Sequence, residues 1–272
     1  MSDFEPNVYA PPKTDALASR DPFGRAWRRF VRQPALILAL AAPLALASGA
    51  VRYQVATSPE GVRSSGDLMR TFRLASGQAT PLERQQIIAR SQRPLGTRWL
   101  LTFGIGLLAW VLTQLIYAAI VGVVLRRESP QYAGLIRAGA LGKLLGATLL
   151  MTLLTGVGLA CCLLPGLLAM LASYFLPEAV ILERKSLPDT LRRVFSLTFR
   201  GGAAVIGFGL LVVVGAGALN MANPLMFPAP LAQATAAGLV QLVTLPVIAL
   251  VWLSFWEDAV EREKAAQPAA AA

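Results

Sequence analysis

The sequence has no histidine, the residue that most often serves proteins as a general base or a metal ligand. It also has no GxSxG or HExxH pattern and no dinucleotide-binding fingerprint. The stretch GALGKL at 139–144 is not a phosphate-binding loop, because no Ser or Thr follows Lys143. These absences predict a protein that is not an enzyme, with no catalytic residue, no cofactor and no metal site.

Cysteine and charge are also scarce. The two cysteines, Cys161 and Cys162, are neighbours in the sequence, which is too few for a disulfide framework and a poor geometry for a bond. Charged residues make up 15% of the chain, against about a quarter in soluble domains. Long windows contain no charge at all, which is typical of segments buried in lipid.

The charges that are present are mainly basic, with a net charge of +10. Arginines cluster beside the hydrophobic runs, where cytoplasmic loops and anionic lipid headgroups would hold them. The chain shows no nucleic-acid-binding module. We therefore expect membrane lipids as partners, and no nucleic acid.

The apolar runs predict an all-α integral membrane protein with about six transmembrane helices. The predicted spans are 34–51, 99–125, 144–164, 166–182, 203–222 and 232–256. The first span is short, and Ala45–Ala47 resembles a signal-peptide cleavage site, so cleavage after it is an alternative. The long hydrophilic stretch 52–98 is predicted to be an extracytoplasmic loop, with a short helix that begins at Pro81.

Between the third and fourth spans, Pro165 and Gly166 interrupt one long apolar run. Pro-Gly is a strong turn signal. The pair predicts a tight helical hairpin with almost no loop.

Two amphipathic segments are predicted to lie at the membrane surface. Asp21 and Pro22 resemble the start of a helix within the N-terminal tail, 1–33. Ser186 and Asp189 resemble the capping pair of a second helix, which Gly201 and Gly202 end. Both helices carry arginines that we expect to bind anionic headgroups: Arg28, Arg29, Arg192, Arg193 and Arg200.

The distribution of Lys and Arg favours a cytoplasmic location for both termini, including the tail 257–272. These residues are concentrated in the tail 1–33, the loop 126–143 and the segment 183–200. The eight arginines of 52–98 disagree, because they would lie outside. A re-entrant first segment is the alternative; it would bring this loop inside and leave five spans.

Polar residues inside spans are candidates for a functional site. Glu178 is the acid that lies well inside an apolar run. It is a candidate ligand for a proton or a cation; alternatively, it is a carboxylate near the interface that pairs with an arginine. Gln114 and Gln241 are candidates for hydrogen bonds between helices. Gly142 and Gly146 match the small-residue motif of close helix packing.

The segment from Leu163 to Gly201 resembles a broad family of bacterial integral membrane proteins related to the membrane domain of glycerophosphoryl diester phosphodiesterases. The residues that carry the resemblance are Pro165, Gly166, Pro177, Glu183, Leu191, Ser196, Leu197, Thr198 and Gly201. Phe195 departs from the small residue that the family often has there. The resemblance implies a fold and a membrane location, and no activity, because the family is largely without one. The phosphodiesterase catalytic domain is absent from this sequence, so its activity does not carry over.

We therefore expect a non-enzymatic inner-membrane protein with a structural, assembly or envelope-maintenance role, with a membrane-protein partner or a second copy of itself. The alternative is a small transporter or a lipid-handling carrier. A carrier coupled through Glu178 should lose function in the Glu178→Gln variant, whereas a structural bundle should tolerate that change.

Overall fold

The computed structural model describes residues 21–57, 80, 81, 85, 97–128, 138–183 and 185–266. Within these residues the named elements are all helices: α1 (Pro22–Arg32), α2 (Pro34–Thr57), α5 (Thr97–Glu128), α6 (Ala138–Cys161), α7 (Leu163–Ser173), α8 (Leu176–Glu183), α9 (Leu187–Arg200), α10 (Gly202–Met226) and α11 (Pro230–Ala266). Five helices, α2, α5, α6, α10 and α11, are long and apolar enough to cross a membrane, and the bent pair α7–α8 makes a sixth candidate. The predicted all-α membrane fold is confirmed.

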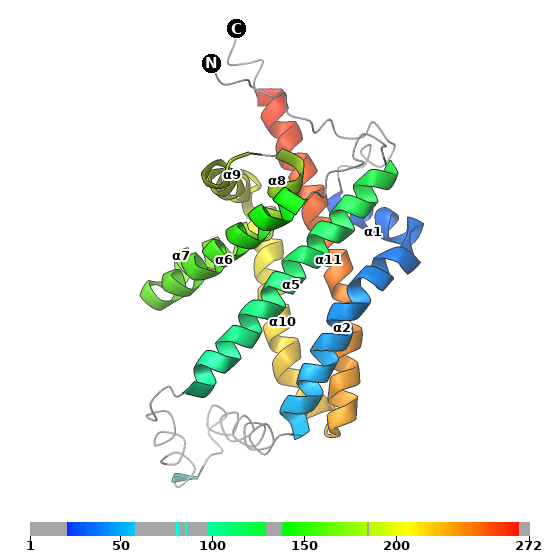
Figure 1. Cartoon of the computed structure of the whole chain (residues 1–272), viewed down its shortest axis with the longest axis vertical. Helices are drawn as coiled ribbons and strands as arrows, with labels where there is room; N and C mark the ends of the chain where they lie inside the picture. The colour runs from blue at the N-terminus through cyan, green and yellow to red at the C-terminus, as the bar shows by residue number, and fades with distance from the viewer. Residues whose placement is uncertain are drawn as a thin grey trace.

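Helices α2 and α11 form the closest long pair of the bundle and run side by side in opposite directions (Figure 1). A Cβ atom on Gly49 would lie 3.1 Å from the carbonyl oxygen of Ala234, and one on Gly238 would lie 3.1 Å from that of Ala45. Small residues on both helices therefore let the two backbones approach, as is common in membranes.

The small-residue motif of α6 does not have this role in the described structure. A Cβ atom on Gly142 or Gly146 would meet nothing within 4 Å. The close packing predicted from this motif is found instead between α2 and α11.

The helical hairpin is confirmed, but its turn lies earlier than predicted. Helix α6 ends at Cys161 and α7 begins two residues later, so the turn falls at Cys162, and Pro165 lies in the first turn of α7. Proline is tolerated there because a backbone N–H in the first turn has no partner within the helix. Gly166 packs against α6: a Cβ atom on Gly158 would lie 2.7 Å from its backbone nitrogen.

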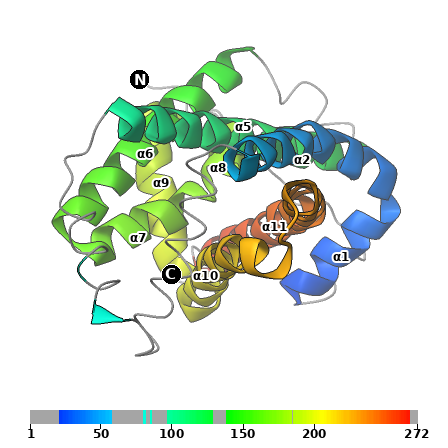
Figure 2. The same cartoon turned by 90° about the horizontal axis from the view of Figure 1, so that it is seen from below.

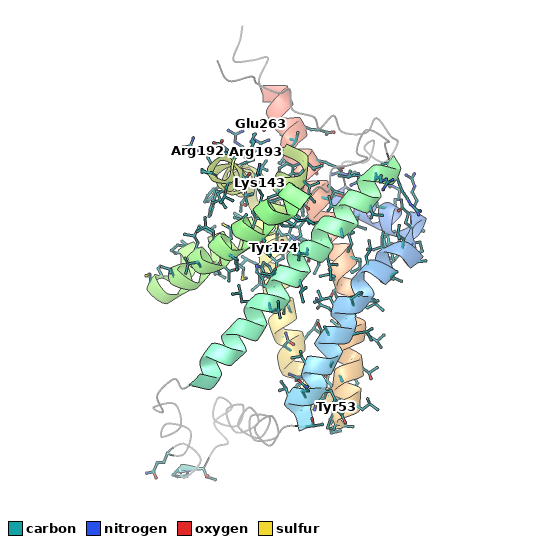
Figure 3. The ribbon with its side chains drawn as sticks, in the orientation of Figure 1. Tyr53, Lys143, Tyr174, Arg192, Arg193 and Glu263 are labelled. Atoms are coloured by element: carbon teal, nitrogen blue, oxygen red, sulfur yellow. The ribbon has the colours of Figure 1, made fainter. Side chains whose placement is uncertain are left out.

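The predicted span 166–182 is broken in the middle. Helices α7 and α8 meet at a 45° bend, which contains Tyr174 and Phe175. The ring of Tyr174 stacks on that of Trp252 in α11 at 5.1 Å between centroids, and the Phe175 ring meets the same Trp252 edge-on at 4.9 Å. Tyr174 lies near mid-height of the molecule, so these contacts fix the bend against the centre of α11 (Figure 3).

Two predicted boundaries change. Helix α2 continues without a break to Thr57 beside α11, which favours a span over a re-entrant segment. Helix α11 continues to Ala266, so the predicted tail 257–272 begins inside a helix, with Glu257 fully buried. Most of the stretch 52–98 lies outside the described residues, and its side of the membrane stays a prediction.

Candidate functional site

Helix α1 begins as predicted from its sequence. The Asp21 carboxylate accepts hydrogen bonds from the backbone nitrogens of Phe23 at 3.0 Å and Gly24 at 2.9 Å. These bonds satisfy two N–H groups that the first turn of a helix leaves without partners.

One face of α1 is held by buried ion pairs. The Arg29 guanidinium donates to both carboxylate oxygens of Glu257, at 2.7 and 3.0 Å, and to both oxygens of Glu128, at 2.8 and 3.0 Å. Arg25, one turn earlier, pairs with Asp258 and donates to the Ser254 carbonyl oxygen at 2.9 Å. Helix α1 is thereby tied to the C-terminal parts of both α5 and α11.

This arrangement corrects the expectation that Arg29 binds lipid headgroups. Arg29 is 2% exposed, and its guanidinium N–H groups are hydrogen-bonded to the carboxylates of Glu128 and Glu257. Burial alone lowers the pKa of Arg29, but the carboxylates of Glu257 and Glu128 outweigh that effect, so the pKa lies above its ordinary value. The guanidinium stays cationic and acts as a link between helices.

A second group of ion pairs joins α8, α9 and α11 at the same end of the molecule (Figure 3). Arg193 donates to Glu183 at 2.7 Å and pairs with Glu263, and Arg200 reaches the same Glu263 at 3.0 Å. Burial lowers the pKa of Arg193, yet its hydrogen bond to Glu263 and the charge of Glu183 raise it overall. Arg193 is therefore also corrected from a headgroup ligand to a link between helices.

The other three predicted headgroup ligands, Arg28, Arg192 and Arg200, are exposed. Arg28 of α1 follows Trp27, which is 59% exposed, and Arg200 of α9 follows Phe199, which is 58% exposed. A basic helix with exposed aromatics suits a membrane surface. Headgroup binding by these three arginines stays a prediction.

A cavity of about 970 Å³ is lined by residues of four candidate spans, α2, α5, α10 and α11. Seen from below, α2 and α5 lie on one side and α10 and α11 on the other (Figure 2). Its walls are mainly apolar, with Leu108, Leu112, Leu211 and Val240 among the lining residues. Gln241, a predicted intramembrane polar residue, also lines it. Pockets of about 300–1,000 Å³ with apolar walls and a few polar groups are typical ligand sites.

Gln114 and Glu178 are fully buried outside this cavity. Both side chains are 0% exposed. Neither oxygen of Glu178 has a hydrogen-bond partner on another described residue, and the same holds for the amide of Gln114. The described structure thus gives Glu178 no arginine, contrary to the paired alternative, and it does not bring these two residues and Gln241 into one site.

The residues that carry the family resemblance lie along α7, α8 and α9: Pro165, Gly166, Pro177, Glu183, Ser196 and Thr198. Glu183 has a clear structural role, because its carboxylate joins α8 to α9 through an ion pair with Arg193. It also forms an ion pair with Lys185 at 2.9 Å. The Thr198 hydroxyl is buried and donates to the Val194 carbonyl oxygen at 2.9 Å. These contacts fix helices and place no reactive group in a cavity.

The cavity and the Arg29 links were not foreseen from the sequence. Arg52, which lines the cavity, falls just after the predicted first span and was assigned to a loop. The sequence signal that could have indicated this position is a cation one residue beyond the end of an apolar run.

The fold and the apolar surface define a multi-pass helical membrane protein. Helices α6 and α10 expose large apolar side chains that do not line the cavity, which include Leu145, Leu149, Leu153, Leu210 and Val214, as expected of surfaces that face lipid. Comparison with family models, curated proteins and solved structures finds no match to this chain. The relation to the phosphodiesterase membrane domain therefore stays a prediction.

Proposed function

We propose that the chain is a non-enzymatic multi-pass protein of the bacterial inner membrane that holds a lipid in the cavity between α2, α5, α10 and α11. The observation that carries the proposal is the cavity itself. It lies among candidate spans, its volume is about 970 Å³, and its lining is mainly apolar. Of the molecules that surround membrane helices, lipids match such walls best.

The distribution of charge supports placing both ends of the chain in the cytoplasm. Helix α1, helix α9 and the C-terminal part of α11 lie toward one end of the molecule (Figure 1). Arg192 and Arg193 of α9 lie at this end (Figure 3). Arg52 and Arg98 belong to helix ends at the opposite side. An excess of Lys and Arg is typical of the cytoplasmic side.

A role in assembly is the second candidate function. One observation favours it: three glycines of α6, Gly139, Gly142 and Gly146, have nothing within 4 Å of an added Cβ atom. Glycines spaced in this way let a second helix approach closely. A membrane-protein partner or a second copy of this chain would fit there.

The test is native mass spectrometry of the protein purified in mild detergent, with two variants of α10. Gly215 lines the cavity and has open space around it, so Gly215→Phe places a large ring in the cavity. Gly217 also has open space but is not among the lining residues, so Gly217→Phe is the matched control.

We expect bound lipid in the wild type and in Gly217→Phe, and its loss in Gly215→Phe. Equal lipid in all three proteins would contradict the proposal. A stoichiometric protein without lipid in the wild type would favour the assembly role and would identify the partner.

A further inference from the structure

The cavity carries its charge at one end. Arg52 is the charged residue among its described lining residues, and no Asp or Glu is among them. It lies near the end of α2, and its neighbour Tyr53 lies far from Arg193 and Glu263 at the opposite end of the molecule (Figure 3). The cavity is therefore an apolar space with a cation near one end.

This cation has no partner in the described part of the chain. The Nε atom of Arg52 is buried and makes no hydrogen bond there. The ion pairs among the described residues lie at the opposite end of the bundle, so the Arg52 charge is not part of those groups. A guanidinium at the edge of an apolar space is stabilised by an anion, and its planar donors match the oxygens of a phosphate.

A second lining residue has an unmet polar atom. Asn223 is 8% exposed, and its amide nitrogen donates to the Gln233 carbonyl oxygen at 3.1 Å. Its side-chain oxygen is buried and has no donor among the described residues. A hydroxyl group on a ligand would supply that donor.

We propose that Arg52 binds the phosphate of an anionic phospholipid whose acyl chains occupy the apolar part of the cavity. The proposal rests on the lipid-binding function proposed above and specifies the class of lipid. The lipid comes from the membrane leaflet on the α2 C-terminal side, away from the Arg29 and Arg193 ion pairs. Charge complementarity favours this occupant over a second copy of the chain, whose apolar helices would leave the Arg52 charge without a partner.

The experiment places the protein in nanodiscs with equal amounts of phosphatidylglycerol and phosphatidylcholine that have identical acyl chains. The lipids that stay bound after detergent extraction are counted by native mass spectrometry. Arg52→Gln is the test variant. Arg32→Gln is the matched control, because Arg32 is exposed on α1 and does not line the cavity.

Both lipids carry a phosphate, but the choline cation of phosphatidylcholine neutralises its headgroup and repels the Arg52 guanidinium, whereas phosphatidylglycerol keeps a net negative charge. We therefore expect the wild type and Arg32→Gln to retain phosphatidylglycerol over phosphatidylcholine by roughly tenfold, which corresponds to about 1.4 kcal/mol. Arg52→Gln should lower this ratio to about one and still bind lipid. The elution profile of each variant reports whether it is folded.

Other outcomes separate this inference from the proposed function. If the wild type retains both lipids equally and Gly215→Phe removes both, the cavity binds lipid but the Arg52 inference is wrong. If Gly215→Phe removes neither, the proposed function fails. Displacement of the lipid by inorganic phosphate alone would show that the cavity is a site for a free anion. A dimer without bound lipid would show that a second copy of the chain occupies the cavity. Either result would overturn the proposal.

Discussion

Replacing Glu257 with glutamine removes one of the charges that join α11 to α1. The carboxylate is 0% exposed and accepts two hydrogen bonds from Arg29, at 2.7 and 3.0 Å. Removal of one partner from a buried ion pair lowers the free energy of unfolding by about 3–5 kcal/mol. Arg29 keeps its two bonds to Glu128, and the glutamine carbonyl can still accept one, so we expect a loss near the lower limit, about 3 kcal/mol.

Glu178→Gln is the control for this experiment. The two residues undergo the same chemical change, and both carboxylates are 0% exposed. Glu178, however, has no hydrogen-bond partner on another described residue, so its replacement breaks no ion pair. An isolated buried charge is costly, and an unpaired amide costs about 1–3 kcal/mol, so we expect stability that is unchanged or higher.

The assay is unfolding in mixed micelles, by titration with sodium dodecyl sulfate and far-ultraviolet circular dichroism. Equal stability losses in the two variants would refute the reasoning, because burial alone, and not the Arg29 pairing, would then set the effect. An unchanged Glu257→Gln variant would show that the Arg29–Glu257 pair contributes no stability.

Two further predictions concern glycines at close approaches. Gly158→Ala should open the α6–α7 hairpin and lower the free energy of unfolding by about 1–3 kcal/mol, because the added Cβ atom would overlap the Gly166 backbone. Gly156→Ala is the control, because Gly156 has open space around it, and the same unfolding assay should show it to be tolerated. Gly238→Leu should separate α2 from α11 at a similar cost, since its Cβ atom would lie 3.1 Å from a backbone oxygen, and Gly142→Leu on α6 is its control. A tolerated Gly238→Leu would show that this helix pair is looser than described.

The positions of the spans and the starts of α1 and α9 were predictable because their causes are local. An apolar run long enough to cross a bilayer is visible in the sequence alone. The Asp21 cap and the Ser186 cap, whose hydroxyl accepts from the Asp189 backbone nitrogen, each involve residues two or three positions apart.

The partners of the arginines were not predictable, because they depend on which helices meet. Arg29 and Glu257 are 228 residues apart, and nothing near Arg29 in the sequence distinguishes it from Arg28, which is exposed. The hairpin turn was misplaced for a related reason. Gly166 permits close contact with Gly158 of the preceding helix, a use that looks the same in the sequence as a turn.

The two ends of the molecule have different roles, one in stability and the other in lipid binding, and variants at each end can measure the two roles separately. Ion pairs tie α1, α5, α8, α9 and α11 together at one end, and in the described part of the chain none of their residues lines the cavity. Helix α10 packs only lightly on α7, α9 and α11, and it lines the cavity opposite α2. Glu257→Gln should therefore lower stability and leave lipid preference intact, whereas Arg52→Gln should change lipid preference and leave stability intact. A change of both properties in Glu257→Gln would mean that the ion pairs also set the width of the cavity.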